Sequence, residues 1–238
     1  MTTANSAVVV GGGSGIGAAV AARQRANGCE VITWDLVGTG DLECDITDPG
    51  QITAALEATL DLIGYPTTVT ISAGIGQSNY LSDADPTEWD RTMSVNAKGP
   101  WLTMRALAPL MAAGDGGSIV SIGSVSSRIA DKTMGLYCAS KAALDMVVKV
   151  AALEWAPEVR VNAVAPGVTD TPMLGRAPRT GKWLSGVVSR TALGHLGTAN
   201  DIAEAVLAVH SSKWMTGQIV VCDGGLTLHS PIDPTGAG

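Results

Sequence analysis

A short apolar run at residues 7–10 leads directly into the glycine-rich segment Gly11-Gly-Gly-Ser-Gly-Ile-Gly17, and an alanine-rich stretch follows to about Asn27. This order predicts a buried strand, a tight turn and a helix that begins at Gly15. Glycines let the backbone approach a ligand closely, and the N–H groups at a helix N-terminus attract a pyrophosphate. The segment therefore predicts a nucleotide site. Its candidate contacts are Gly11, Ser14, Gly15, Ile16 and Gly17.

A second apolar run, residues 30–34, ends at Asp35, eighteen residues beyond Gly17. A carboxylate at this place would bind the hydroxyls of an adenosine ribose, and it would repel a 2′-phosphate. Position 14 is Ser and Leu36 follows the acid, so the first loop offers no basic residue to a phosphate. We therefore expect NAD, with NADP disfavoured. The competing interpretation of Asp35 is an ordinary helix cap or turn acid.

Tyr137 and Lys141 stand four residues apart, and Tyr137 follows Ser124 by thirteen residues. Residues at this spacing share one face of a helix, so the Lys141 ammonium can lie beside the Tyr137 phenol and favour its ionised form. A serine hydroxyl from a neighbouring strand end can then hold a substrate oxygen while the tyrosine moves a proton. Taken alone, the pair could equally be an exposed helix face.

Further motifs occur in a fixed order along the chain. Cys44-Asp-Ile-Thr47, Ile71-Ser-Ala-Gly74, Ser94-Val-Asn-Ala-Lys-Gly99 and a loop from Pro166 to Thr171 follow the glycine segment. With these motifs the chain resembles the classical short-chain dehydrogenase/reductase family over nearly its whole length. The resemblance implies four catalytic residues, namely Asn96, Ser124, Tyr137 and Lys141. It also implies cofactor contacts from Asp35, Leu36, Asp45, Ile46, Ser72, Ala73, Gly74, Tyr137, Lys141, Pro166, Gly167, Val168 and Thr171.

The same resemblance implies individual roles for several of these residues. Asn96 would bind a water that links Lys141 to bulk solvent, and Lys141 would also hold the nicotinamide ribose. Val168 and Thr171 would orient the carboxamide. A buried residue at a helix kink is the competing interpretation of Asn96.

Three departures from the family pattern are visible. Val10 replaces the usual Thr and Ser72 the usual Asn, which removes side-chain hydrogen bonds that brace the loops, at a cost of roughly 1 kcal/mol each. The interval from Asp35 to Asp45 is only ten residues. A crossover helix needs at least about ten to twelve residues, so we expect none here and an unusually bare adenine side.

Strand-like and helical segments alternate along the remaining chain. Asp48-Pro49 and Asp85-Pro86 predict two helix starts. The expected strands lie near residues 67–72, 118–121, 159–165 and 218–221, and the expected helices near 51–62, 85–112, 133–155 and 200–210. This alternation predicts an α/β fold: a single-domain, Rossmann-type, doubly wound parallel sheet of about seven strands over residues 1–238, with helices on both faces. Residues 229–238 are expected to form a loose or interface tail.

Composition excludes several classes of protein. A net charge of −7 and a pI near 4.8 argue against nucleic acid or an anionic membrane as partner. No apolar run approaches a membrane span and no basic flank precedes residues 7–10, so we expect a cytoplasmic protein. The four cysteines are expected to be reduced thiols, and no spacing predicts a metal site. His195, His210 and His229 are expected at the surface or an interface.

The stretch from 171 to 190 corresponds by resemblance to the lid over the substrate. Its Arg176, Arg179 and Lys182 suggest a clamp for a carboxylate, an acyl-thioester carrier or a phosphate. Met134, Met173 and Trp183 could instead line an apolar pocket for a ring or steroid, and a solvated loop with neither role is the third interpretation. The candidate substrate contacts are Ser124, Met173, Arg176 and Trp183.

These observations predict an NAD-dependent oxidoreductase that interconverts a secondary alcohol and a ketone, with Tyr137 as acid/base. An NADPH-linked 3-oxoacyl reductase acting on acyl-carrier-protein or CoA thioesters is the alternative enzyme. A non-catalytic nucleotide-sensing protein is the alternative of another class. The resemblance also implies a homo-oligomer, either a tetramer or a dimer.

Overall fold

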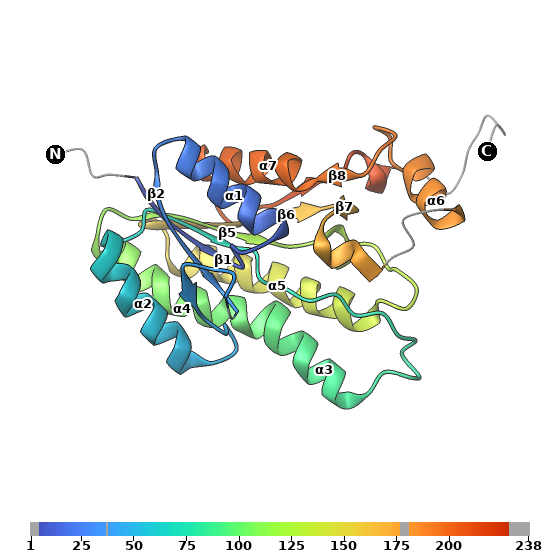
Figure 1. The fold of residues 1–238 in the computed structure, drawn as a ribbon, viewed down its shortest axis with the longest axis horizontal. Coiled ribbons are helices and arrows are strands. Elements are labelled where there is room, and N and C mark those ends of the chain that lie inside the picture. The colour runs from blue at the N-terminus through green and yellow to red at the C-terminus, as the bar shows by residue number, and fades with distance from the viewer. Residues whose placement is uncertain (1–4, 37, 177–180, 229–238) are drawn as a thin grey trace.

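The computed structural model describes residues 5–36, 38–176 and 181–228. Its centre is a sheet of seven parallel strands in the order β3-β2-β1-β4-β5-β6-β9 (Figure 1). The predicted parallel α/β sheet is confirmed. The strands are β1 (Ser6–Val10), β2 (Glu30–Asp35), β3 (Leu42–Glu43), β4 (Thr68–Ile71), β5 (Gly117–Ile122), β6 (Val159–Pro166) and β9 (Ile219–Cys222).

Helices cover both faces of the sheet (Figure 1). α1 and α7 pack together on one face, and α2, α4 and α5 lie on the other. The helices are α1 (Gly15–Ala26), α2 (Pro49–Ile63), α3 (Pro86–Met93), α4 (Gly99–Ala113), α5 (Gly135–Glu154), α6 (Lys182–Arg190) and α7 (Ala199–Ser211).

Two helices begin at the caps that the sequence predicts. The Asp48 carboxylate accepts the Gly50 N–H at 2.7 Å at the start of α2. At the start of α3, Asp85 and Glu88 form a capping box. In both helices a proline occupies the first turn, where its missing N–H costs no intrahelical hydrogen bond.

After Ser6, β1 is apolar throughout because its side chains enter two cores, one on each face of the sheet. In β1, Val8 and Val10 belong to the core under α2, α4 and α5, whereas Ala7 and Val9 belong to the core under α1 and α7. Successive side chains of a strand point to opposite faces. A continuous apolar run is therefore what a strand covered on both sides requires.

The chain reverses its direction across the sheet between β3 and β4, because β2 and β3 lie on one side of β1 and β4 lies on the other. At such a switch point the loops after neighbouring strands diverge and open a crevice at the carboxyl ends. The loops after β1 and β4 still touch at their base. A Cβ on Gly11 would stand 2.5 Å from the Ala73 nitrogen, and the φ of Gly11 is +74°, so glycine is required there.

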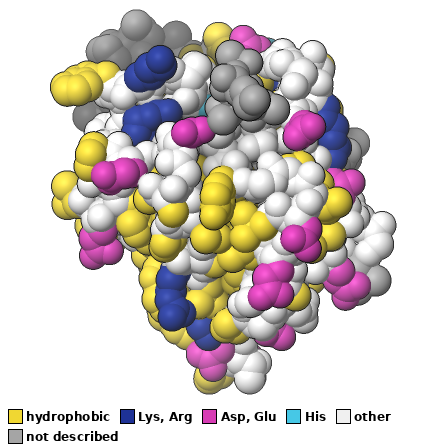
Figure 2. Space-filling model, turned by 90° about the vertical axis from the view of Figure 1, so that its left-hand side faces the viewer, with side chains coloured by type: hydrophobic (Ala, Val, Ile, Leu, Met, Phe, Trp, Pro, Cys, Tyr) yellow, Lys and Arg dark blue, Asp and Glu magenta, His cyan; other side chains and the backbone are white. Residues whose placement is uncertain are grey.

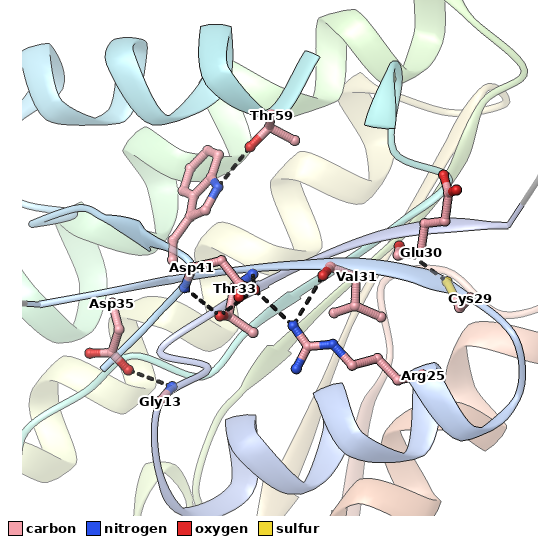
Figure 3. A network of polar contacts seen from close by, with 10 residues as sticks. Gly13, Arg25, Cys29, Glu30, Val31, Thr33, Asp35, Asp41 and Thr59 are labelled. Carbon is pink, nitrogen blue, oxygen red and sulfur yellow. Dashed lines mark hydrogen bonds and ion pairs between the residues drawn. The ribbon is translucent and has the colours of Figure 1, made fainter. Parts of the chain in front are cut away.

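A compact loop joins β2 to β3 in place of a helix, as the short interval predicts. Asp41 closes this loop: its carboxylate accepts the Thr33 N–H and hydroxyl, each at 2.8 Å, and the Arg25 guanidinium at 2.7 Å (Figure 3). Burial raises the pKa of Asp41, but these hydrogen bonds and the Arg25 charge together hold it below its ordinary value. Polar bonds thus fix the loop where a packed helix would otherwise do so.

The long helical stretch before Ala113 contains a wider turn that the sequence analysis does not predict. Residues Ser94–Lys98 form a π-helical turn between α3 and α4, and the Gly99 N–H donates to the Ser94 carbonyl five residues earlier. Pro100 has no N–H to donate to the Asn96 carbonyl, as an α-helix would require. The π-helical turn thus lies at the place where this α-helical hydrogen bond cannot form.

A pair of two-residue strands also lies outside the predictions. β7 (Thr169–Asp170) and β8 (Gly197–Thr198) pair in parallel at the carboxyl end of β6. Their pairing connects the residues just before the lid segment, 171–190, to the residues that follow it.

His210 is half-buried on α7. Its Nε2 is 3.0 Å from the Thr70 hydroxyl, beneath α7. Burial and the Arg160 charge lower the pKa of His210 to about 3. Within the described part of the chain, Nδ1 has no hydrogen-bond partner. The ring borders a cavity of about 480 Å³ that Ser118 and Arg160 also line.

Figure 2 shows the side of the molecule on which β1 begins. Hydrophobic side chains gather across the middle of this face, with acidic and basic side chains scattered around them.

Over residues 5–36, 38–176 and 181–228, every helix is too short or too polar to span a membrane.

Candidate active site

The glycine loop places the N-terminus of α1 at the crevice. Gly17 packs directly against the Gly11 carbonyl, where a Cβ could not fit. Ser14 precedes the helix with extended backbone, φ −153° and ψ 170°. The first N–H groups of a helix have no intrahelical acceptor, so this turn can donate to an anion. The geometry is the one that residues 11–17 predict, and Ile16 lies in the same first turn.

Asp35 ends β2 beside this loop. One carboxylate oxygen accepts the Gly13 N–H at 2.7 Å and the other accepts the Leu36 N–H at 2.7 Å. Figure 3 shows the first of these bonds, which ties the strand end to the glycine loop. Each carboxylate oxygen has a further lone pair. Asp35 therefore braces the loop and can still accept ribose hydroxyls.

The remaining adenine-side residues line the same edge of the sheet. Ser72, the first residue after β4, donates its N–H to the Val10 carbonyl at 2.8 Å. Asp45 follows β3, and its carboxylate accepts both the N–H and the hydroxyl of Thr47 at 2.8 Å. Ile46 is buried against Gly99. Asp45 thus shapes its own turn, and its contact with an adenine remains a prediction.

Two of the four predicted catalytic residues, Asn96 and Lys141, lie beside Gly74. A Cβ on Gly74 would stand 3.3 Å from Asn96 Oδ1 and 3.6 Å from Lys141 Nζ. Lys141 Nζ donates to the Ile122 carbonyl at 2.9 Å, so the ammonium is held at the end of β5. The same Nζ lies 5.8 Å from the centre of the Tyr137 ring.

Ser124 supplies the hydroxyl of the group. It follows β5 and accepts the Ser126 N–H at 3.1 Å, which caps a short 3-10 turn, Val125–Ser127. The Ser124 side chain also hydrogen-bonds the Tyr137 phenol. The serine, the tyrosine and the lysine are therefore assembled as the spacing predicts.

Burial shifts the pKa values of both Tyr137 and Lys141. Burial raises the pKa of Tyr137, and the hydrogen bond from Ser124 offsets this only in part. Burial also lowers the pKa of Lys141 to about 8, against the opposing effect of Asp145. In both groups desolvation is the largest effect on the pKa. That Lys141 favours the ionised phenol remains a prediction.

Asn96 lies in the π-helical turn and is fully buried. Its Nδ2 donates to the Ile75 carbonyl at 2.9 Å and to the Ser140 hydroxyl at 3.1 Å, and its Oδ1 accepts the Ile75 N–H at 2.8 Å. Ser140 in turn donates to the Tyr137 carbonyl at 2.7 Å. Asn96 therefore links the loop after β4 to α5. Asn96 is thus a buried residue of an irregular turn between two helices, and its water-binding role remains a prediction.

The loop after β6 closes the other side of the crevice. Gly167 packs against Asp223, where an added Cβ would approach to 2.8 Å, and the Val168 carbonyl accepts the Gly197 N–H at 3.1 Å. A Cβ built on Gly15 would stand 3.6 Å from the Thr171 Cβ. The glycine loop and the end of β7 thus face each other across a narrow gap. Pro166 ends β6 at the same edge.

The lid residues are placed only in part. Met173 lies in the 3-10 turn Pro172–Arg176, and its Cε is 3.9 Å from where a Cβ on Gly74 would stand. Trp183 is half-buried on α6. The Arg176 side chain, all of Arg179 and the tail 229–238 lie outside the described residues. Substrate contacts by Arg176 and Trp183 remain predictions.

Two polar residues near the site are missing from the sequence analysis. Asp145 lies one turn beyond Lys141 on α5, is 8% exposed, and accepts the Ser127 hydroxyl at 2.6 Å. The i, i+4 spacing from Lys141 on an otherwise apolar helix face is the signal that could have found it. Gln77, in the loop after β4, has no sequence spacing of this kind that would have pointed to it.

The described residues offer no metal centre. No three His, Cys, Asp or Glu side chains in that part of the chain come together to hold a metal ion. All four cysteines are free thiols. The polar groups at the crevice are instead hydroxyls, a phenol, an amide and an ammonium.

Known proteins similar to this chain agree on one family. Residues 10–227 match the family model described as enoyl-(acyl carrier protein) reductase. The (3R)-3-hydroxyacyl-CoA dehydrogenase of Canis lupus familiaris is 33% identical over 251 residues, covering 93% of this chain and 96% of that protein. The NADP-dependent (R)-specific alcohol dehydrogenase of Lentilactobacillus kefiri is 34% identical, covering 93% and 96%. The ligand-free aldohexose dehydrogenase of Thermoplasma acidophilum superimposes with a TM-score of 0.91 at 29% identity, covering 97% and 96%.

Proposed function

The chain belongs to the short-chain dehydrogenase/reductase family, and from this premise we propose that it interconverts a secondary alcohol and a ketone by hydride transfer to or from a nicotinamide nucleotide. The observation that carries the proposal is the grouping of Ser124, Tyr137 and Lys141 at the end of β5. A hydroxyl, a phenol and an ammonium converge there beside the crevice that the glycine loop opens. The three relatives described above are dehydrogenases or reductases by name.

The glycines that line the crevice leave room for a dinucleotide. A Cβ on Gly74 would fill space between Asn96, Lys141 and Met173, and Gly15 leaves a gap toward Thr171. In this proposal the α1 N-terminus receives the pyrophosphate, and Val168 and Thr171 orient the carboxamide. When bound, the nucleotide supplies the nicotinamide C4 that accepts or gives the hydride.

Tyr137 is the acid/base of the proposed reaction. In the oxidation, the phenolate takes the alcohol proton while the C–H bond of the carbinol carbon breaks and its electron pair leaves as hydride; the reduction reverses both transfers. Ser124 hydrogen-bonds the substrate oxygen. Because burial raises the pKa of Tyr137, the Lys141 charge is needed to make the phenolate accessible. Asn96 holds the water through which Lys141 exchanges protons with solvent.

NAD is the proposed cofactor. The Asp35 carboxylate lies at the glycine loop, where it would accept ribose hydroxyls and repel a 2′-phosphate. The loop that follows, residues 36–41, contains no Lys or Arg. One relative is NADP-dependent by name, so the family as such does not decide the preference. The position of Asp35 supports NAD.

Titration of the purified protein with NADH and with NADPH, followed by nicotinamide fluorescence, tests this cofactor assignment. We expect NADH to bind at least about tenfold more tightly, a difference of about 1.4 kcal/mol. Tighter binding of NADPH would reject NAD in favour of the alternative reductase. Binding of neither nucleotide would favour a degenerate protein without this activity.

Turnover of a panel of secondary alcohols tests the reaction itself. Wild-type protein should reduce NAD with some members of the panel, and Tyr137→Phe should lose this activity while it still binds NADH. A wild-type protein that binds NADH but turns over no alcohol or ketone would support the nucleotide-sensing alternative.

A 3-oxoacyl thioester reductase is the second candidate function. The matching family model is described by an acyl-carrier-protein reductase, and one relative is named for hydroxyacyl-CoA. The described lid residue Lys182 is exposed on α6 and would suit an anionic carrier. Reduction of acetoacetyl-CoA with NADPH faster than with NADH would favour this candidate.

The proposed enzyme is a homo-oligomer, a dimer or a tetramer, located in the cytoplasm. Exposed apolar side chains on α4 and α5 support the assembly: Trp101 is 43%, Met146 58% and Leu153 82% exposed. Light scattering of wild type and Leu153→Glu tests it. A wild-type monomer would reject this part of the proposal.

A further inference from the structure

A row of polar side chains crosses the sheet at the edge opposite the crevice. Thr68, Ser118 and Arg160 are direct neighbours in the register of β4, β5 and β6, and each lies near the amino end of its strand. Val120, two residues beyond Ser118, belongs to the core under α1 and α7. Residues two apart in a strand point to the same face, so the row lies on the face that α1 and α7 cover.

The row borders a cavity of about 480 Å³, a volume in the range of small-molecule sites. His210, at the end of α7, and Lys213, in the loop after it, also line the cavity. The proposed catalytic residues lie instead at the carboxyl ends of the strands. The cavity is therefore separate from the candidate active site, and no step of the proposed reaction uses it.

Two buried polar atoms at this cavity lack a hydrogen-bond partner among the described residues. They are Oγ of Ser118, a residue that is 2% exposed, and Nδ1 of His210. Native structures rarely leave such atoms unpaired, because burial removes the water that would otherwise satisfy them. A ligand held between the polar row and the end of α7 would supply the missing partner to both.

The hydrogen bond to Thr70 indicates which nitrogen of His210 carries the proton. Thr70 is fully buried, and Nε2 of His210, at 3.0 Å, is the one side-chain partner of its hydroxyl within the described residues. If Nε2 carried the proton, the hydroxyl hydrogen of Thr70 would have no acceptor. Nε2 therefore accepts, and the neutral ring presents Nδ1–H to the cavity. The Ser118 hydroxyl is a second donor without an acceptor.

Arg160 supplies a positive charge and covers the negative end of α7. Its guanidinium donates to the carbonyls of His210 at 2.8 Å, Ser212 at 2.7 Å and Met215 at 3.2 Å. These bonds occupy carbonyl groups at the end of the helix that would otherwise repel an anion. They use three of the five guanidinium N–H groups, and the other two remain for a ligand.

The charges around the cavity also favour an anion. Lys213 is exposed and forms no ion pair or hydrogen bond within the described part of the chain. Glu158 is the one acid among the described residues that line the cavity, against the two basic residues Arg160 and Lys213. In a chain of net charge −7, this cavity is thus a local site of positive charge.

We propose that the cavity binds the phosphate group of a small molecule. A phosphate group carries about −1.5 to −2 charges at pH 7 and three strong acceptor oxygens. These oxygens accept from Nδ1–H of His210, from the Ser118 hydroxyl and from the free N–H groups of Arg160. The phosphate charge matches Arg160 and Lys213 together. A carboxylate carries one charge, which leaves one of the two cations unmatched, and a cation would be repelled by both.

Nitrogen NMR of histidine-labelled protein tests the proposal at His210 itself. In the free protein the spectrum should show the Nδ1–H tautomer. Inorganic phosphate should shift the His210 signals in a saturable way, whereas sodium chloride at the same ionic strength should not. His195, an exposed histidine outside the cavity, is the internal reference.

Two further ligands identify the source of the phosphate group. A dissociation constant for glycerol 3-phosphate at least about tenfold below that of inorganic phosphate would identify a phosphorylated metabolite. An equal or higher constant would identify free phosphate as the ligand. Acetate should bind at least about tenfold more weakly than inorganic phosphate at the same ionic strength.

Single substitutions locate the bound phosphate. Ser118→Ala should raise the dissociation constant at least about tenfold, because a hydrogen bond to a charged group is lost. Lys213→Gln, at the surface, should raise it about threefold, as expected for an exposed charge. Ser121→Ala is the matched control: Ser121 is a buried serine of the same strand, also unpartnered among the described residues, and it points to the other face. This variant should bind phosphate as wild type does.

Four results would overturn the proposal. An Nε2–H tautomer of His210 would remove a donor on which the site depends. His210 signals that do not respond to phosphate would mean that buried water alone pairs the two atoms. Equal binding by wild type, Ser118→Ala and Lys213→Gln would place the phosphate elsewhere, for example at the N-terminus of α1. Acetate binding as tight as that of phosphate would exclude phosphate as the recognised group. None of these results bears on the proposed oxidoreductase activity.

Discussion

The Asp145 carboxylate lies one helical turn beyond Lys141 on α5 and raises the pKa of that ammonium, against the larger effect of burial, which lowers it to about 8. A hydrogen bond of 2.6 Å from Ser127 fixes the carboxylate. Asp145 therefore favours the charged form of the buried lysine.

Asp145→Asn should make the Lys141 pKa fall below about 8, because the variant removes the one charge that raises it. The proposed reaction needs charged Lys141, so turnover declines as the pH rises through this pKa. The decline in kcat/KM should therefore occur at lower pH in the variant, as measured between about pH 6 and pH 10. Glu154→Gln, at an exposed acid of the same helix, should leave the profile in place. An unshifted profile in Asp145→Asn would contradict the electrostatic role.

Asp35→Asn should reduce the preference for NADH over NADPH. The amide can still accept the Gly13 N–H, so the loop keeps its bond, but the charge that repels a 2′-phosphate is gone. We expect NADH to bind about tenfold more weakly and NADPH to gain in relative terms, as measured by nucleotide titration. Asp61→Asn, an exposed acid on α2, is the control. Unchanged ratios of the two dissociation constants would remove Asp35 from the cofactor site.

Asn96→Ala should destabilise the protein by about 2–4 kcal/mol, because three hydrogen bonds are lost, one of them the buried bond to Ser140, and the Ile75 backbone loses its partner. Urea unfolding measures this loss. The variant should also lose kcat, since the loop beside Lys141 is no longer fixed. Asn162→Ala removes a comparably buried amide on β6, far from the crevice. It should cost stability alone, and equal losses of kcat in both variants would contradict a specific role of Asn96.

His210 should make the protein unusually sensitive to acid. Its pKa is about 3 in the folded protein and near 6.5 when unfolded, so between these values the unfolded state binds more protons and folding free energy is lost as the pH falls. At pH 4.5 the loss from this residue should be about 2–3 kcal/mol relative to pH 7. His210→Gln retains a polar group for Thr70 and does not titrate, so it should flatten the dependence. His195→Gln, at an exposed histidine, should behave like wild type.

Local patterns were sufficient to predict most of the sheet and the assembly of the site. The apolar run before Gly11 and the acid at the end of the next strand are contiguous signals, and both lead to the glycine loop as expected. The four-residue spacing of Tyr137 and Lys141 likewise predicts a shared helix face. Each of these predictions depends on residues that lie within one turn or one strand of each other.

The wrong or missing predictions depend on contacts between distant elements. His210 stands in the last turn of α7, and its hydrogen bond to Thr70 on the facing strand is a contact that the sequence pattern does not predict. The pKa of Tyr137 rises because of burial that helix spacing cannot express. β7 and β8 are two residues each, too short to leave a periodic pattern.

The π-helical turn before α4 makes the number of residues between α3 and α4 as important as their identity. Such a turn holds one residue more than an α-helical turn, so removing one residue from Ser94–Lys98 would change the angular offset between α3 and α4. Every residue on one side of the deletion would then rotate by about 100° relative to the other side. Asn96 would turn away from Ile75 and Ser140 although no catalytic side chain had been changed. The spacing itself is thus a constraint that a comparison of residue types would overlook.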